Sequence, residues 1–171
     1  KDIQHVRNTL NTIEDNIKKM FEELDHLLDS EKYAKNKMEE LVPRISDLKK
    51  YLLQNRTQYG TAEIVFETEL SKISKELEAI DDEIEDGNYI EAQEQMEVIE
   101  KQANELEEKI ETFPIVYKQC RLTVPKLLDD LAIAMNEMQE NGFKVEIFGF
   151  DKEIRQYKQL LKDGMRELDA G

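Results

Sequence analysis

Residues 38–84 read MEELVPRISDLKKYLLQNRTQYGTAEIVFETELSKISKELEAIDDEI, and apolar side chains recur along them at steps of three and four. That spacing gives an α-helix one apolar stripe, which other helices must cover. The stripe keeps its phase through residues 54–60, although the composition of that segment is typical of a loop. We therefore predict one helix over residues 31–86, either kinked at Pro43 or beginning nearer to it, and long enough to join successive bundles.

A second apolar stripe lies upstream and predicts a helix over residues 2–29. Its members follow the same spacing and are Ile3, Val6, Leu10, Ile13, Ile17, Met20, Leu24 and Leu27. We predict a turn at Asp29 and Ser30, because serine is a favoured N-cap for the helix that follows.

The clearest turn signal is formed by Gly87 and Asn88. Glycine readily adopts the left-handed conformation that ends many helices, and asparagine is a favoured N-cap for the next one. We predict a third helix over residues 88–141, with breaks at Pro114 and Pro125.

The segment FKVEIFGF, residues 143–150, is short, apolar and alternating. It could form a strand, but a single strand would have no partner in an otherwise helical chain. We therefore predict an apolar loop that packs over one end of a bundle. A last helix is expected over residues 151–169, with Asp151 as its N-cap.

These elements predict an all-α fold of elongated antiparallel helical bundles. We expect residues 1–86 to form a first bundle segment and residues 87–171 a second one, with the long helix 31–86 shared between bundles. The apolar stripe begins almost at the first residue, so we expect the chain to be an internal piece of a longer protein.

Composition and charge exclude several classes of function. The net charge of −15 argues against binding to nucleic acid or to anionic lipid, because both need a basic surface. The single cysteine, Cys120, permits no disulfide within the chain, which fits a reducing compartment. No run of apolar residues is long enough to span a membrane.

The chain offers little for catalysis or metal binding. Asp2 and His5 form one acid–histidine pair and Glu23 and His26 form another, but they lie on one predicted helix, about 31 Å apart along its axis. Cys120 falls on an apolar stripe, where a lone thiol is usually a small core residue. We predict no catalytic residue, no cofactor, no metal and no small-molecule substrate.

One polar cluster, Gln54, Asn55 and Arg56, interrupts the apolar stripe in the middle of the predicted long helix. Two interpretations remain open at this point. An asparagine on a helix stripe can fix the register of packed helices, as it does in coiled coils. Alternatively, the three residues form a docking patch for a partner protein.

Three stretches of the chain are similar to motifs of a known family. They are QYGTAEIVFE (residues 58–67), DGNYIEA (residues 86–92) and PKLLD (residues 125–129) followed by Gly142 and Phe143. Together they resemble the EzrA family, the septation-ring regulators of low-GC Gram-positive bacteria. The resemblance covers most of the chain from about Leu52 onward.

The resemblance implies a cytoplasmic region of spectrin-like three-helix repeats that share long helices, in a parent protein held by one N-terminal membrane helix that this chain lacks. It also implies a non-catalytic scaffold that binds the tubulin-like division protein FtsZ and other division proteins and opposes misplaced ring assembly. The family has a Gln-Asn-Arg patch tied to function, near the C-terminal end of the full-length proteins, and Gln54, Asn55 and Arg56 spell it.

Two other functions compete with the scaffold. One is a purely structural spacer with no partner-binding face of its own, and the other is a helical-bundle metalloenzyme. The separation of the two acid–histidine pairs disfavours the metalloenzyme.

Overall fold

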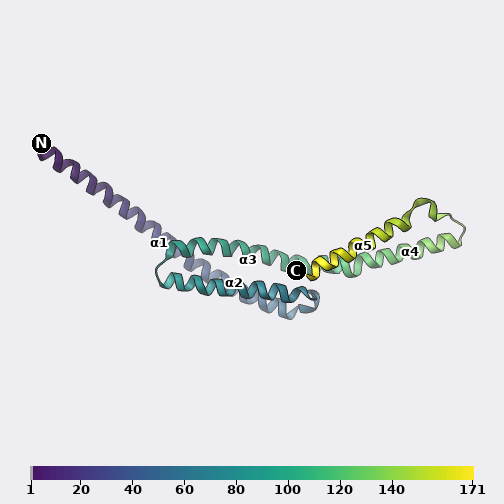
Figure 1. Cartoon of the computed structure of the whole chain (residues 1–171). Coiled ribbons are helices and arrows are strands. Elements are labelled where there is room, and N and C mark those ends of the chain that lie inside the picture. The colour runs from purple at the N-terminus through teal and green to yellow at the C-terminus, as the bar shows by residue number, and fades with distance from the viewer. Residues whose placement is uncertain (1) are drawn as a thin grey trace. The chain divides into compact units, whose positions relative to one another are not determined.

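The computed structural model describes residues 2–171, and every regular element in that part of the chain is a helix (Figure 1). The α-helices are α1 (Asp2–Gln54), α2 (Ala62–Glu85), α3 (Tyr89–Lys118), α4 (Val124–Glu140) and α5 (Phe150–Asp169). Between them lie the 3-10 helices η1 (Arg56–Gln58) and η3 (Val145–Phe148) and the π-helical segment η2 (Gln119–Thr123). The predicted all-α fold is confirmed.

The first of two compact units comprises the chain up to Ser46 together with Lys72–Ala103, so α1, α2 and α3 build it. Its core is made of apolar side chains that recur on each helix at steps of three and four. They are Ala34, Leu41, Ile45, Ile73, Leu77, Ile80, Ile84, Ala92, Met96, Ile99 and Ala103.

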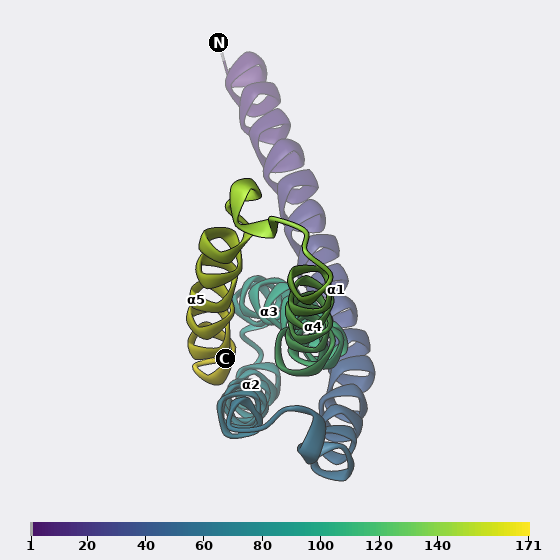
Figure 2. The same cartoon turned by 90° about the vertical axis from the view of Figure 1, so that its right-hand side faces the viewer.

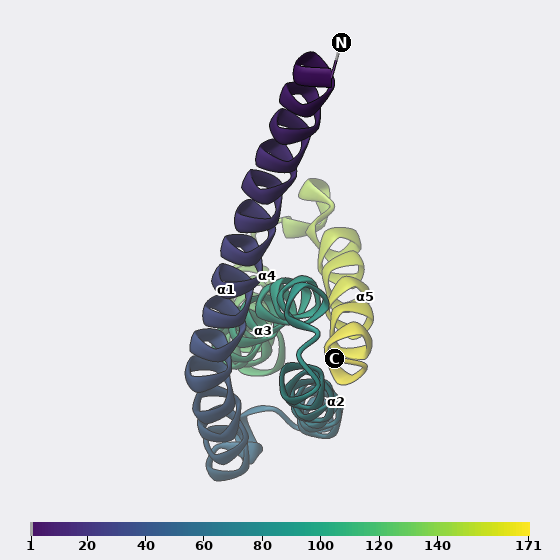
Figure 3. The ribbon, with the colours of Figure 1, turned by 90° about the vertical axis from the view of Figure 1, so that its left-hand side faces the viewer.

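The N-terminal part of α1 contributes nothing to that core. All side chains from Asp2 to His26 are exposed, including the whole predicted stripe up to Leu24. Figures 1 and 3 show this part of α1 running past the turn between α2 and α3. The stripe therefore has no cover within the residues that the structure describes.

The second unit comprises Asp47–Ser71 and Asn104–Gly171. Four aromatic rings pack in its core, Tyr59, Phe66, Phe113 and Tyr117, with ring centroids 5.4–5.9 Å apart in the contacting pairs. A smaller cluster lies between α4 and α5, which run side by side as a hairpin (Figure 2), and consists of Leu128, Met135, Val145 and Ile154.

Helices α1, α2 and α3 each contribute residues to both units, whereas the helix predicted to be shared, residues 31–86, does not form as one helix. Each unit combines residues from both predicted segments, 1–86 and 87–171. That segment division stays a prediction.

The predicted turn at Asp29 and Ser30 is wrong. Helix α1 passes straight through it, and Ser30 is fully buried within the helix rather than placed at an N-cap. Aspartate and serine inside a helix each lower its stability by only a few tenths of a kcal/mol relative to good helix formers. Two such residues therefore need not end the helix.

The predicted single helix over residues 31–86 is also wrong. Helix α1 ends at Gln54, and α2 begins at Ala62 after η1 and a turn in which Gly60 adopts a φ of +57°. Leu52, Tyr59 and Ala62 are nevertheless all buried. The stripe keeps its phase because the connection returns the chain to the same core, not because the helix continues.

The turn predicted at Gly87 is confirmed, and hydrogen bonds explain its shape. The amide of Asn88 donates to the carbonyl of Glu83 over 2.9 Å, and the amide of Gly87 donates to that of Ile84 over 3.1 Å. These two bonds define a Schellman motif, which satisfies carbonyl groups at the end of α2. It requires the left-handed conformation that Gly87 adopts, with a φ of +82°.

The prolines act differently from one another. Pro43 lies inside α1, so the predicted helix start near it is wrong. Pro114 likewise lies inside α3 rather than breaking it. Pro125 lies in the first turn of α4, and the chain stays helical before it through the π-helical η2, so the break predicted at Pro125 is absent too.

Residues 143–150 form no strand, in agreement with the prediction of a loop. The segment contains the 3-10 helix η3. Only Val145 of this segment is buried, so most of its apolar side chains do not pack over the bundle as expected. The predicted N-cap Asp151 is wrong: α5 begins at Phe150, and Gly149 occupies the N-cap position with a φ of +69°.

Candidate protein-binding surface

The turn between α1 and α2 holds the three predicted site residues. Gln54 ends α1, Asn55 follows it and Arg56 begins η1. The cluster therefore lies at a helix end. The prediction that it lies in the middle of a long helix is wrong. Both the backbone amide and the side-chain amide of Asn55 donate to the carbonyl of Tyr51, at 3.0 and 2.9 Å. Asn55 thus helps to end α1.

Gln54 and Arg56 remain available to a partner. Both side chains are exposed, and Arg56 makes no ion pair with the residues that the structure describes. By contrast, Asn55 is half-buried. Its side-chain oxygen accepts a hydrogen bond of 3.4 Å from the side-chain amide of Gln58. The structure brings the three residues together but commits Asn55 to the turn itself.

The turn is anchored to the core by Tyr59. Its side chain is fully buried, and its hydroxyl donates to the carbonyl of Ile110 over 2.7 Å. Burial raises the pKa of the Tyr59 hydroxyl well above its ordinary value, and nearby Tyr51 raises it further, so the group stays protonated and remains a donor. The backbone amide of Tyr59 also donates to the carbonyl of Arg56 over 3.1 Å, which links Arg56 to this anchor.

A hollow of about 640 Å³ lies beside the turn, within the same unit. Its lining combines turn residues with the end of α3 and with η2, and comprises Thr57, Gln58, Pro114, Ile115, Tyr117, Lys118, Arg121 and Leu122. Ile115 and Leu122 are large apolar side chains with more than half of their surface exposed. The sequence analysis did not predict this hollow. The available signal was that Ile115 and Leu122 are large apolar residues that lie off the apolar stripe of their helix.

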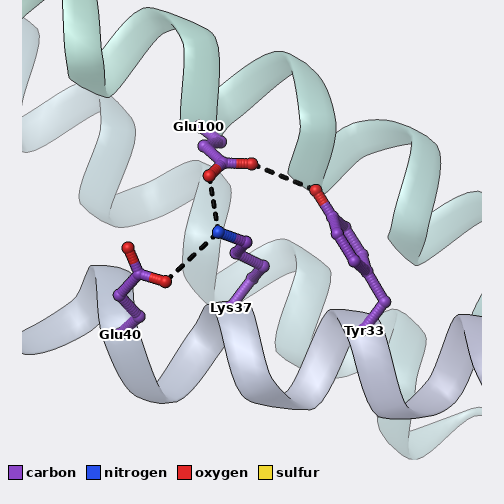
Figure 4. Close-up of polar contacts among 4 residues, drawn as sticks. All are labelled: Tyr33, Lys37, Glu40 and Glu100. Atoms are coloured by element: carbon purple, nitrogen blue, oxygen red, sulfur yellow. Dashed lines mark hydrogen bonds and ion pairs between the residues drawn. The ribbon is translucent and has the colours of Figure 1, made fainter.

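A separate polar network lies in the other unit, between α1 and α3 (Figure 4). The ammonium of Lys37 contacts the carboxylate of Glu100 at 2.6 Å and that of Glu40 at 3.2 Å, and Tyr33 donates to Glu100 over 3.0 Å. The Lys37 contact holds the pKa of Glu100 below its ordinary value, and the same pair raises the pKa of Lys37. The contacts that Lys37 and Tyr33 make with Glu100 join α1 to α3.

The residues considered for metal or thiol chemistry lie on different elements, α1 and η2. His5 and His26 are exposed along α1. Within residues 2–171, no group of three or more His, Cys, Asp or Glu side chains could hold a metal ion. The thiol of Cys120 is half-buried and donates weakly to the carbonyl of Leu161 over 3.5 Å. In the same part of the chain, no helix is long and apolar enough to cross a membrane.

The whole chain, residues 1–171, matches the family model described as septation ring formation regulator, EzrA. Among the relatives is the septation ring formation regulator of Oceanobacillus iheyensis, 37% identical over 162 residues, which covers 95% of this chain and 29% of the relative. That of Bacillus subtilis is 30% identical over 169 residues and covers 96% of the chain and 30% of the relative.

The chain thus spans less than a third of the length of these curated relatives. A third relative, from Bacillus licheniformis, is 29% identical over 168 residues, with 29% of its length covered. No solved structure is significantly similar to the chain.

Proposed function

Because the chain belongs to the EzrA family of septation ring formation regulators, we propose that it is a non-catalytic scaffold module that binds division proteins through the turn at residues 54–58. The partner is FtsZ or another division protein, and binding opposes assembly of the FtsZ ring. In the full-length protein the module lies on the cytoplasmic side of the cell membrane, at the septum, tethered by a single membrane helix outside this chain.

The observation that carries the proposal is the position of Arg56. Arg56 is exposed, and it directly precedes Thr57 and Gln58, which line the hollow beside the turn. Arginine next to an apolar hollow is a common anchor of protein interfaces, since it offers a forked set of donors and an apolar stem. The buried anchor at Tyr59 keeps this surface ordered before a partner arrives, which lowers the entropy lost on binding.

The alternative is a structural spacer with no binding face. It is favoured by the use of Asn55 in ending α1, since that gives the polar cluster a role without any partner. The two functions differ in what a charge reversal at an exposed residue of the turn would do.

The experiment is assembly of FtsZ with GTP, followed by light scattering and pelleting, with and without the chain. We expect the chain to pellet with FtsZ or to lower the amount assembled. The variant Arg56→Glu should lose most of this effect. Lys101→Glu is the matched control. It makes the same change of charge at an exposed position outside the turn, on α3.

If neither co-pelleting nor reduced assembly occurs, the module is a spacer with respect to FtsZ. If both variants lose the effect equally, the interaction depends on net charge and not on the turn.

A further inference from the structure

A second hollow, of about 560 Å³, lies between the helices of the α4–α5 hairpin and shares Arg121 with the hollow beside the turn at residues 54–58. Its floor is apolar and combines the start of α4 with the middle of α5 and with η2. The floor residues are Cys120, Pro125, Leu128, Leu161 and Met165. All of them belong to one compact unit. We call this hollow the hairpin groove.

The rim of the hairpin groove is basic. Arg121, Lys158, Lys162 and Arg166 line it, against a single acidic side chain, Asp129. This local excess of positive charge stands out in a chain whose net charge is −15. With this composition, an average patch of the surface would carry an excess of acidic side chains.

Two of the four cations have partners of their own. Arg166 contacts Asp163 at 3.1 Å, and Arg121 donates to the hydroxyl of Tyr117 over 2.6 Å. Lys158 and Lys162 are exposed and make no ion pair within residues 2–171. They follow one another by one helical turn along α5, so they present two charges in a row along the groove.

The wall formed by η2 is π-helical, with Cys120 and Arg121 on it. Short π-helical segments are rare and frequently lie at functional sites, because they shift side chains out of the regular helical positions. Both of these residues line the groove, and Arg121 also lines the hollow beside the turn at residues 54–58.

We propose that the hairpin groove binds an acidic amphipathic segment of a partner protein. Apolar side chains of the segment enter between α4 and α5, and its carboxylates pair with Lys158 and Lys162. This is the mode in which an amphipathic helix lies in an apolar groove with complementary charges at the edge. An acidic segment is repelled by most of this chain's surface, so the basic rim determines where it binds.

The test uses the full chain and three short fluorescein-labelled peptides. The first is designed as an amphipathic helix with leucine on one face and glutamate on the other. The second carries lysine in place of glutamate, and the third carries serine in place of leucine. Fluorescence anisotropy measures binding. Because Cys120 is the only cysteine and lies in the floor, the rate of its alkylation gives an independent readout of occupancy.

We expect the acidic leucine peptide to bind at least about tenfold more tightly than the other two and to slow alkylation of Cys120. The double variant Lys158→Glu/Lys162→Glu should weaken this binding by about tenfold or more. The control is Lys144→Glu/Lys152→Glu, which makes the same change of charge in the same unit outside the groove.

The proposal is overturned if the basic or the serine peptide binds as tightly as the acidic one, or if both double variants weaken binding equally. Circular dichroism checks that each variant remains helical. Should Lys158→Glu/Lys162→Glu fail to fold, the neutral Lys158→Gln/Lys162→Gln replaces it, with the same expected order of affinities.

Discussion

The hydroxyl group of Tyr59 donates a hydrogen bond of 2.7 Å to the backbone carbonyl of Ile110. In an unbroken α-helix this carbonyl would accept the amide hydrogen of residue 114. That residue is Pro114, which has no amide hydrogen, so the carbonyl would otherwise be left without its partner inside α3. The turn after α1 therefore supplies the donor that a proline removes from another helix.

The substitution Tyr59→Phe should destabilise the chain by about 2 kcal/mol, because it leaves a buried carbonyl group unsatisfied. In a Pro114→Ala background the cost should be smaller, since the alanine provides an amide hydrogen to the Ile110 carbonyl. Chemical denaturation of the four proteins in this cycle measures the coupling. Tyr157→Phe, at an exposed position, is the control and should change stability little.

An equal cost of Tyr59→Phe in both backgrounds would contradict this account. It would mean that the hydroxyl stabilises the core independently of the proline.

Gly60 makes a second close contact in the same turn. A Cβ atom at Gly60 would lie 2.7 Å from the hydroxyl of Tyr117, and the φ of +57° is itself unfavourable for other residues. We expect Gly60→Ala to cost about 2–3 kcal/mol, and Gly87→Ala, at a φ of +82° with nothing within 4 Å, about 1 kcal/mol. Thermal and denaturant unfolding compare the two variants.

The variant Tyr117→Phe separates the two contributions at Gly60. It removes the oxygen atom nearest to the added Cβ, so Gly60→Ala should cost less in that background. If Gly60→Ala and Gly87→Ala cost the same, the contact with Tyr117 adds nothing and only the backbone conformation matters.

The buried stripes could be predicted from the sequence because burial imposes a helical period on apolar residues. Ile73, Leu77 and Met96 are buried where the spacing predicts. The period does not report whether a helix continues, since a connection of suitable length returns the next stripe to the same core. The stretch from Leu52 to Tyr59 shows this, because the phase survives a turn.

The candidate site was visible only in part. Polar composition pointed to Gln54 and Arg56, but the hollow beside them needs Ile115 and Leu122 to approach the turn from another part of the chain. Such proximity depends on how the helices pack, which the spacing of residues along one helix does not contain. The same holds for Ser30, whose burial depends on the neighbouring helices and not on its own sequence context.

The contact between Lys37 and Glu100 predicts a dependence of stability on pH. Because Lys37 holds the pKa of Glu100 below its ordinary value of 4.5, the ionised carboxylate is favoured in the folded state. Its stabilising contribution is present above the pKa of the unfolded chain and is lost as the pH falls through the lower folded value. Glu100→Gln should therefore lower the melting temperature near neutral pH, and the difference should vanish well below pH 4.5.

The control for this prediction is Glu94→Gln, an exposed position on the same helix. It should leave the melting temperature nearly unchanged at every pH. A difference between wild type and Glu100→Gln that persists in strong acid would show that the effect comes from packing and not from the charge.

The exposed stripe of α1 gives the last prediction. Leu10 has 59% of its surface exposed, whereas Leu41 on the same helix is fully buried. Leu41→Ala should therefore cost about 3 kcal/mol through the lost burial and the cavity left behind, and Leu10→Ala no more than about 0.5 kcal/mol. Denaturant unfolding at several protein concentrations measures both. A large cost of Leu10→Ala that grows with concentration would show that a second copy of the chain covers the stripe in solution, and a large cost independent of concentration would contradict the exposure itself.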